Sequence, residues 1–250
     1  VKPVDFFDPV NAVRGLFAKL INASDPDRVA IIPSVSYGIA NVVKNINAIS
    51  DQNIVLLEEQ FPSNYYSWKR LAEEKNLEIR IAKPSKDIIN RAASWNDNIL
   101  QLIDENTLAV AMPIVHWADG TKFDLKSIRK KTTQMGAKLI IDGTQSIGAM
   151  PFDFNDIQPD ALICVSYKWL LGPYSIGLAY YGEAFDNGIP IEESWMSREN
   201  SEDFRGLVDY EDNYRDKAFK YNVGEFTSFI RMPMVKIALE TILGWGIQNI

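Results

Sequence analysis

The chain has 250 residues, of which 46% are hydrophobic and 24% are charged, a balance typical of one sizeable globular domain and not of a disordered segment. Lys and Arg total 26 against 33 Asp and Glu, so the net charge is −7, and no basic stripe is present that could follow the phosphates of a nucleic acid. A single cysteine, Cys164, excludes an intrachain disulfide, and a single histidine, His116, excludes a metal site built from several histidines.

Short apolar runs alternate with amphipathic segments along the chain. The longest runs, such as residues 109–115, fall far short of the roughly 20 residues that a membrane helix needs. No signal-peptide pattern opens the chain either, so we expect a cytoplasmic protein that does not enter a membrane.

Helical and strand-like patterns follow one another from the start. A helix begins at Asp8 with apolar residues on one face, and seven strands follow, near residues 29, 54, 78, 109, 138, 161 and 176. Helical segments separate the early strands, which is the pattern of parallel strands joined by crossover helices. The sequence therefore predicts an α/β fold with a seven-stranded, mostly parallel sheet and helices on both of its faces.

The first strand, 29–32, leads into a helix through Ser34, Val35 and Ser36. Hydroxyls and free N–H groups at a helix N-terminus favour an anion, because the dipole and the unpaired donors point at the ligand. An ordinary serine N-cap explains the same residues. A similar choice arises at the end of the fourth strand, where His116 is either a functional side chain or a structural one.

The strands near 138 and 161 end in chemically reactive side chains. Asp142 ends the first of them and Gln145 follows three residues later, while the second delivers Ser166, Tyr167 and Lys168. A lysine there either buries its apolar stem and extends its amine to water, or holds the amine in a site where its pKa can fall. Because the carboxyl ends of parallel strands meet at one edge, we expect Asp142, Gln145 and Lys168 to share a rim. An amine, a carboxylate and a donor for a phenolic oxygen are what a pyridoxal phosphate (PLP) site requires.

The order strand-Asp-x-x-Gln, then strand-Ser-x-Lys-x-x-x-Gly-Pro, resembles the large domain of the class V aminotransferases. These fold-type I PLP enzymes include cysteine desulfurases, isopenicillin-N epimerase and kynureninase. The resemblance implies that Lys168 forms a Schiff base with PLP and moves the Cα proton of a small amino acid. It also implies that Asp142 keeps the pyridine nitrogen protonated, and that Gln145 and His116 contact the phenolic oxygen.

The phosphate contacts follow from the same resemblance. Val35, through its backbone N–H, and Ser36 match the phosphate-contacting pair of the family, and Ser166 and Tyr167 would join them. In desulfurases the position of Tyr167 is commonly a histidine. The tyrosine therefore favours the kynureninase and epimerase side of the class.

Phe61 is expected to stack on the pyridine ring, because family members place an aromatic residue or a histidine here. Phe61-Pro-Ser-Asn64 is similar to the Phe-Pro-Thr/Ser-Asp of kynureninase. Plain core packing of Phe61 is the alternative. Asn64 departs from the Asp of that pattern, so no hydrolase-specific role is carried over to it.

Residues 188–221 form a long charged and aromatic stretch without clear periodicity, the kind of segment that usually serves a site or an interface. The residues around Trp195 are similar to a kynureninase segment whose Trp reaches the phosphate of the neighbouring subunit. Residues 221–228 are similar to a second inter-subunit contact, made by either Glu225 or Thr227. The resemblance thus implies a homodimer with active sites shared across a two-fold interface.

Residues 1–250 are expected to form the PLP-binding large domain, with sequence missing at both ends. Residues 231–250 are expected to be an exit helix toward a smaller C-terminal domain that carries the arginine for the substrate carboxylate. The expected activity is that of a PLP-dependent transaminase or lyase. A kynureninase-like hydrolase, an epimerase, a desulfurase and a non-catalytic PLP-fold protein are the alternatives. Cys164, predicted inside a buried strand, cannot be the mobile cysteine of a desulfurase.

Overall fold

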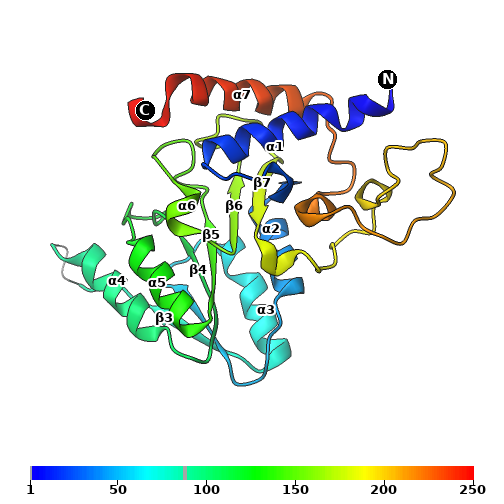
Figure 1. Ribbon diagram of the computed structural model, residues 1–250. Coiled ribbons are helices and arrows are strands. Elements are labelled where there is room, and N and C mark those ends of the chain that lie inside the picture. The colour runs from blue at the N-terminus through cyan, green and yellow to red at the C-terminus, as the bar shows by residue number, and fades with distance from the viewer. Residues whose placement is uncertain (1, 87–88) are drawn as a thin grey trace.

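The computed structural model describes residues 2–86 and 89–250, and these residues form a sheet of seven strands (Figure 1). The strand order is β1-β7-β6-β5-β4-β2-β3. The strands from β2 to β6 pair in parallel, while β7 runs antiparallel to both β1 and β6. The strands are β1 (Val29–Ile32), β2 (Asn53–Leu57), β3 (Glu78–Ala82), β4 (Thr107–Pro113), β5 (Lys138–Asp142), β6 (Ala161–Val165) and β7 (Gly177–Tyr181).

Helices cover both faces of the sheet (Figure 1). One face packs against α1 (Asp8–Leu20), α4 (Arg91–Leu102), α5 (Leu125–Met135), the single turn α6 (Phe154–Ile157) and α7 (Arg231–Trp245). The other face packs against α2 (Val35–Asn45) and α3 (Tyr66–Lys75). No helix in the described residues is both long enough and apolar enough to cross a membrane. The predicted α/β fold with a mostly parallel seven-stranded sheet is confirmed.

The central strands are buried on both faces because almost all of their residues are apolar. In β5, Leu139 and Ile141 point to one face and Ile140 to the other, and all three are fully buried. Burial of each such side chain contributes about 1.5–3 kcal/mol relative to exposure, so the two apolar faces together hold the helices against the sheet. Continuous apolar runs of this kind are typical of parallel strands.

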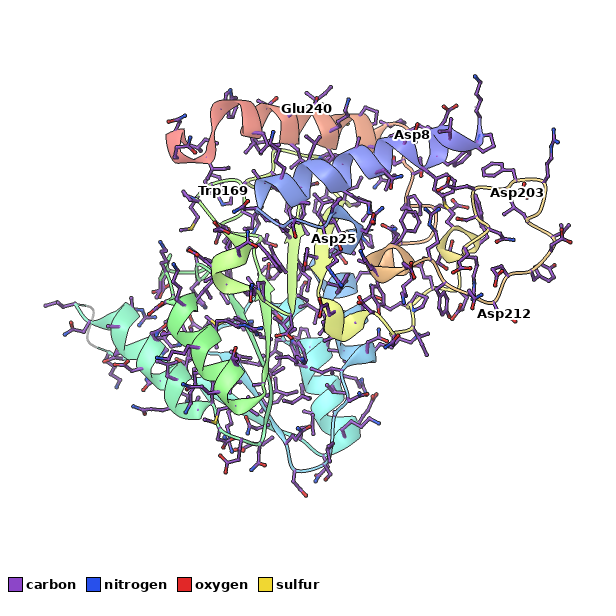
Figure 2. All side chains as sticks on the ribbon, in the orientation of Figure 1. Asp8, Asp25, Trp169, Asp203, Asp212 and Glu240 are labelled. Carbon is purple, nitrogen blue, oxygen red and sulfur yellow. The ribbon has the colours of Figure 1, made fainter. Side chains whose placement is uncertain are left out.

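α7 packs along α1, and the two helices lie side by side at the top of Figure 1. Asp8 on α1 and Glu240 on α7, both labelled in Figure 2, mark this pair. Val235, Leu239 and Ile242 on the inward face of α7 are buried in the same core as α1. The expectation that residues 231–250 lead toward a further domain stays a prediction.

Candidate active site

The carboxyl ends of β4, β5 and β6 lie next to one another at one edge of the sheet. Pro113 at the end of β4 pairs with Asp142 at the end of β5, and Asp142 pairs with Ile163, two residues before the end of β6. A pocket lies at this edge. Six of the residues selected from the sequence line it, namely Val35, Phe61, Asp142, Gln145, Tyr167 and Lys168.

Asp142 is the buried carboxylate of this pocket, with 7% of its surface exposed. Burial raises its pKa above the ordinary value, while hydrogen bonds from Thr144 and the charge of Lys168 act in the opposite direction. The Thr144 N–H donates to the Asp142 Oδ1 at 3.0 Å. A carboxylate buried in this way is stabilised by a cationic partner, such as a protonated ring nitrogen.

Thr144, which the sequence patterns did not single out, links the ends of β5 and β6. Its Oγ1 accepts a hydrogen bond from the Val165 N–H at 3.4 Å. Because that oxygen accepts from Val165, its own hydrogen is free to donate to Asp142, and this second hydrogen bond also favours the ionised carboxylate. Thr144 therefore orients the Asp142 side chain through both its backbone and its hydroxyl.

Lys168 lies on a tight loop between β6 and β7. The Gly172 N–H donates to the Ser166 carbonyl at 2.8 Å, which closes the loop around Lys168. Gly148, at a φ of 97°, brings the preceding turn against this loop, because a Cβ at that position would collide with the Trp169 carbonyl oxygen. The backbone that carries Lys168 is therefore held in place both by its own loop and by the neighbouring turn.

Two aromatic rings form one wall of the pocket. The Lys168 Nζ lies 5.6 Å from the centre of the Phe61 ring, within the range of a cation–π contact. Trp117 meets Phe61 edge to face with 5.6 Å between the ring centres. The Trp117 Nε1–H donates to the Glu59 carbonyl at 2.7 Å, which fixes the indole. Phe61 thereby offers a supported aromatic face on which a flat ligand ring can stack.

The N-terminus of α2 contributes Val35 to the pocket. Ser34 caps the helix, since its Oγ accepts from the Tyr37 N–H at 3.2 Å. The Ser36 hydroxyl lies 2.9 Å from the Ser34 hydroxyl, and Ser36 does not line the pocket. The N–H groups of Val35 and Ser36 have no partner within the helix, as at every helix start, so the cap and an anion site are compatible.

Two residues expected at the cofactor, Ser166 and His116, do not line the pocket. Ser166 is fully buried and its hydroxyl donates to the Pro173 carbonyl at 2.7 Å. His116 is 1% exposed, with its Nε2 3.2 Å from the Glu58 carbonyl oxygen and its ring centre 4.9 Å from that of Trp95. The His116 Nδ1 has no hydrogen-bond partner and lies 3.4 Å from the Asp119 Oδ1, so the expected role of His116 stays a prediction.

Trp195 lies apart from the pocket of its own chain. It is 38% exposed and packs edge to face against Phe204, with 5.5 Å between the ring centres. Figure 2 shows Asp203 and Asp212 on the same stretch of chain, which projects away from the sheet. The expected contact of Trp195 with a neighbouring subunit stays a prediction.

Glu225 and Thr227, the two candidates for the second inter-subunit contact, also lie outside the pocket. The Thr227 hydroxyl donates to the Phe6 carbonyl. Glu225 is exposed and adopts a left-handed backbone conformation with a φ of 54°. Of the two, Glu225 has the side chain that is free to reach another molecule, while the hydroxyl of Thr227 is engaged within its own chain.

The pocket has further lining residues that sequence reasoning did not select: Gln60, Asn64, Pro113, Trp117, Thr144 and Val165. Several of them adjoin residues that it did select, since Trp117 follows His116 and Thr144 lies two positions after Asp142. The sequence signal for Trp117 and Thr144 was their position just after the end of a strand. For Gln60 and Asn64, which flank Phe61, no sequence pattern indicates that their side chains face the pocket.

The chain is similar to curated proteins over most of its length. It is 27% identical over 238 residues to the uncharacterized aminotransferase YcbU of Bacillus subtilis, covering 95% of this chain and 60% of that protein. It is 26% identical over 219 residues to a cysteine desulfurase of Pectobacterium atrosepticum, covering 86% of this chain and 53% of that protein. The chain thus spans between half and three fifths of the length of these relatives.

Among solved structures, the fold matches that of the cystine C-S lyase C-DES, a variant of which has glycine covalently linked to its PLP cofactor. The TM-score is 0.82 at 18% identity, covering 96% of this chain and 62% of the other. A family model described as aminotransferase class-V matches residues 4–196, the range that contains every residue lining the pocket. The chain belongs to the aminotransferase class-V family.

Proposed function

We propose that the chain is the cofactor-binding part of a PLP-dependent enzyme that acts on a small amino acid as a transaminase or lyase. The observation that carries the proposal is the presence of Asp142 and Lys168 in one pocket beside the Phe61 ring. A buried carboxylate, an amine and an aromatic face fit the ring nitrogen, the aldehyde and the ring face of PLP. The family and the PLP-containing relative support the same function.

Each of these side chains has a defined task in the proposed site. When bound, PLP supplies an aldehyde and a ring that accepts electrons. Lys168 presents an amine nucleophile to the aldehyde and takes and returns the Cα proton of the substrate. Asp142 holds a proton on the pyridine nitrogen, because a cationic partner stabilises its buried carboxylate. Phe61 covers one face of the ring and shields it from water.

Cleavage of a carbon–sulfur bond is the second candidate, favoured by the desulfurase and C-S lyase relatives. Cys164 has no part in it, because the side chain is fully buried in β6 and burial raises the pKa of its thiol. A reaction that hands sulfur to an enzyme thiol therefore needs a cysteine other than Cys164. Release of sulfur as free sulfide needs none.

A panel of amino acids tests the proposal. The purified protein is loaded with PLP and incubated separately with alanine, serine, cysteine, cystine and kynurenine. A transaminase yields a 2-oxo acid and converts the cofactor to its pyridoxamine form, whereas a lyase acting on cysteine yields pyruvate, ammonia and sulfide with the cofactor unchanged. Release of anthranilate from kynurenine would indicate the hydrolase instead. Bound PLP with no product from any substrate would contradict catalysis and favour a non-catalytic PLP-fold protein.

The site is proposed to be completed across a two-fold homodimer, with Trp195 reaching the pocket of the neighbouring subunit. Exposed aromatic side chains support this proposal. Trp169 and Tyr174, on the loop that carries Lys168, are 47% and 72% exposed, and Trp195 is exposed as well. Large aromatic side chains are enriched in protein interfaces, where they bury much surface and still satisfy one polar atom.

Mixing of two inactive variants tests the shared site. Chains with Lys168→Ala and chains with Trp195→Ala are combined, and activity is measured after subunit exchange has been confirmed. If Trp195 acts across the interface, mixed dimers contain one intact site, and activity returns to about a quarter of the wild-type value, since half of the dimers are mixed. No gain over the separate variants would contradict the shared site.

A further inference from the structure

Two polar side chains of the pocket wall have an atom without a hydrogen-bond partner. Asn64, at the end of the short 3₁₀ helix η3 (Pro62–Asn64), is 1% exposed and its Nδ2 is unpartnered. Gln60 is 9% exposed and its Oε1 is unpartnered. Both residues line the pocket. Of the six buried side-chain atoms without a partner in the described residues, these two belong to pocket-lining residues, where a bound ligand can satisfy them.

The hydrogen bonds of Asn64 and Gln60 fix which end of each side-chain amide is the oxygen and which is the nitrogen. The Trp68 Nε1–H, which only donates, donates to the Asn64 Oδ1 at 3.0 Å, so the amide nitrogen of Asn64 is the unpartnered atom. The Gln60 Nε2 donates to the Ala111 carbonyl at 3.1 Å, so the oxygen of Gln60 is the unpartnered atom. Two pocket-lining residues therefore hold one donor and one acceptor in fixed orientations.

The donor lies near the helix end that favours an anion. η3, which ends at Asn64, packs against α2, and Val35 at the start of α2 lines the same pocket as Asn64. The N–H groups of the first turn of α2 and the Asn64 Nδ2 are thus neutral donors on one side of the pocket. Neutral donors of this kind, together with the helix dipole, suffice to bind a phosphate group.

The hydroxyls expected to hold the phosphate leave room for another donor. The Ser166 hydroxyl donates to Pro173, and Ser36 is paired with Ser34. Among the pocket-lining residues in the described parts of the chain, the one cation is Lys168, whose amine the proposed chemistry assigns to the aldehyde. Of the expected hydroxyls, that of Tyr167 belongs to a pocket-lining residue, and the three acceptor oxygens of a phosphate leave room for a further neutral donor beside it.

We propose that the Asn64 Nδ2 donates a hydrogen bond to the phosphate group of bound PLP, beside the N–H groups that open α2. This inference rests on the proposed PLP function of the site. A phosphate monoester near neutral pH carries acceptor oxygens and few hydrogens, so it binds the Asn64 donor and not the Gln60 oxygen. Gln60, equally buried on the same wall but of opposite polarity, is therefore the matched control.

Binding of PLP and of pyridoxal, which lacks only the phosphate, tests the inference on the full chain. Dissociation constants are measured by titration followed through the cofactor absorbance. Asn64→Leu is expected to weaken PLP binding roughly 10- to 100-fold, the effect of one hydrogen bond to a charged group, and to leave pyridoxal binding within about twofold. Asn64→Asp keeps the acceptor for Trp68 and places a negative oxygen where the donor was, so it remains informative where the leucine variant does not fold.

Gln60→Met is expected to change the two affinities by the same factor. Equal losses of PLP and pyridoxal binding in the Asn64 variants would overturn the inference, because the donor would then serve the ring. A loss confined to PLP in Gln60→Met would overturn it as well. A wild-type protein that binds neither compound would overturn the proposed function itself, and this inference with it.

Discussion

Replacing Lys168 with alanine is expected to abolish covalent attachment of PLP and to lower turnover by about 10²- to 10⁴-fold, the usual contribution of one positioned proton-transferring group. The amine is the proposed nucleophile of the pocket, and its Nζ lies 5.6 Å from the centre of the Phe61 ring. The fold is expected to survive, because Leu170 and the hydrogen bond from Gly172 to Ser166 hold the loop. Borohydride reduction of the PLP-loaded protein followed by mass spectrometry of its peptides measures the attachment.

The matched control is Lys126→Ala. Lys126 is exposed, pairs with Asp156 at 2.7 Å and does not line the pocket. Its replacement is expected to leave one reducible cofactor per chain on the peptide that contains Lys168. An adduct that persists on another lysine in Lys168→Ala would contradict the assignment of Lys168.

The sheet and the placement of Asp142 and Lys168 in one pocket were predictable from local patterns. Strand β6, at Ala161–Val165, is an uninterrupted apolar run bounded by Asp160 and Ser166, so its limits are visible in the sequence. Asp142 and Lys168 follow such runs, and parallel strands bring their carboxyl ends to one edge. The prediction that Asp142 and Lys168 lie close together therefore depended mainly on the rule that parallel strands end at one edge of the sheet.

Side-chain direction was not predictable in the same way. Ser166 directly follows a strand, as Asp142 ends one, yet its hydroxyl turns to the Pro173 carbonyl because the loop folds back there. His116 is occupied by Glu58 and Trp95, which lie far from it in the sequence. Gln60 and Asn64 line the pocket, and Ala111 and Trp68 hold one end of each side-chain amide. These orientations depend on tertiary partners, which no local pattern contains.

Asp142→Asn is expected to stabilise the PLP-free protein at neutral pH. Burial raises the folded-state pKa of Asp142 above its value in the unfolded chain. The folded protein thus holds this proton more tightly than the unfolded chain does. The stability that follows is fully present below about pH 4 and is lost as the pH rises through the folded-state pKa. Above the pKa of the unfolded chain, the buried carboxyl group therefore destabilises the PLP-free fold, and a neutral amide does not.

Thermal unfolding of the PLP-free proteins between pH 4 and pH 8 measures this difference. The advantage of Asp142→Asn is expected to grow with pH, at about 2–4 °C in Tm for each kcal/mol in a chain of this length. Asp160→Asn is the matched control, and it is expected to lower Tm at neutral pH. Arg129 and Lys138 contact the Asp160 carboxylate at 2.8 and 3.1 Å, and the substitution removes both ion pairs. A lower Tm for Asp142→Asn at neutral pH would mean that the carboxylate is a structural acceptor for Thr144.

Addition of PLP is expected to reverse this order. A protonated pyridine nitrogen would give the Asp142 carboxylate a cationic partner in addition to the charge of Lys168, so PLP is expected to raise the Tm of the wild type more than that of Asp142→Asn. Turnover of the variant is expected to fall on the order of 10²- to 10³-fold, as for the removal of one preorganised electrostatic partner, because a neutral amide does not keep the nitrogen protonated. Equal shifts in Tm on adding PLP would contradict a pairing between Asp142 and the ring. A reversal would show that this buried carboxylate is retained for chemistry at a cost to the stability of the empty fold.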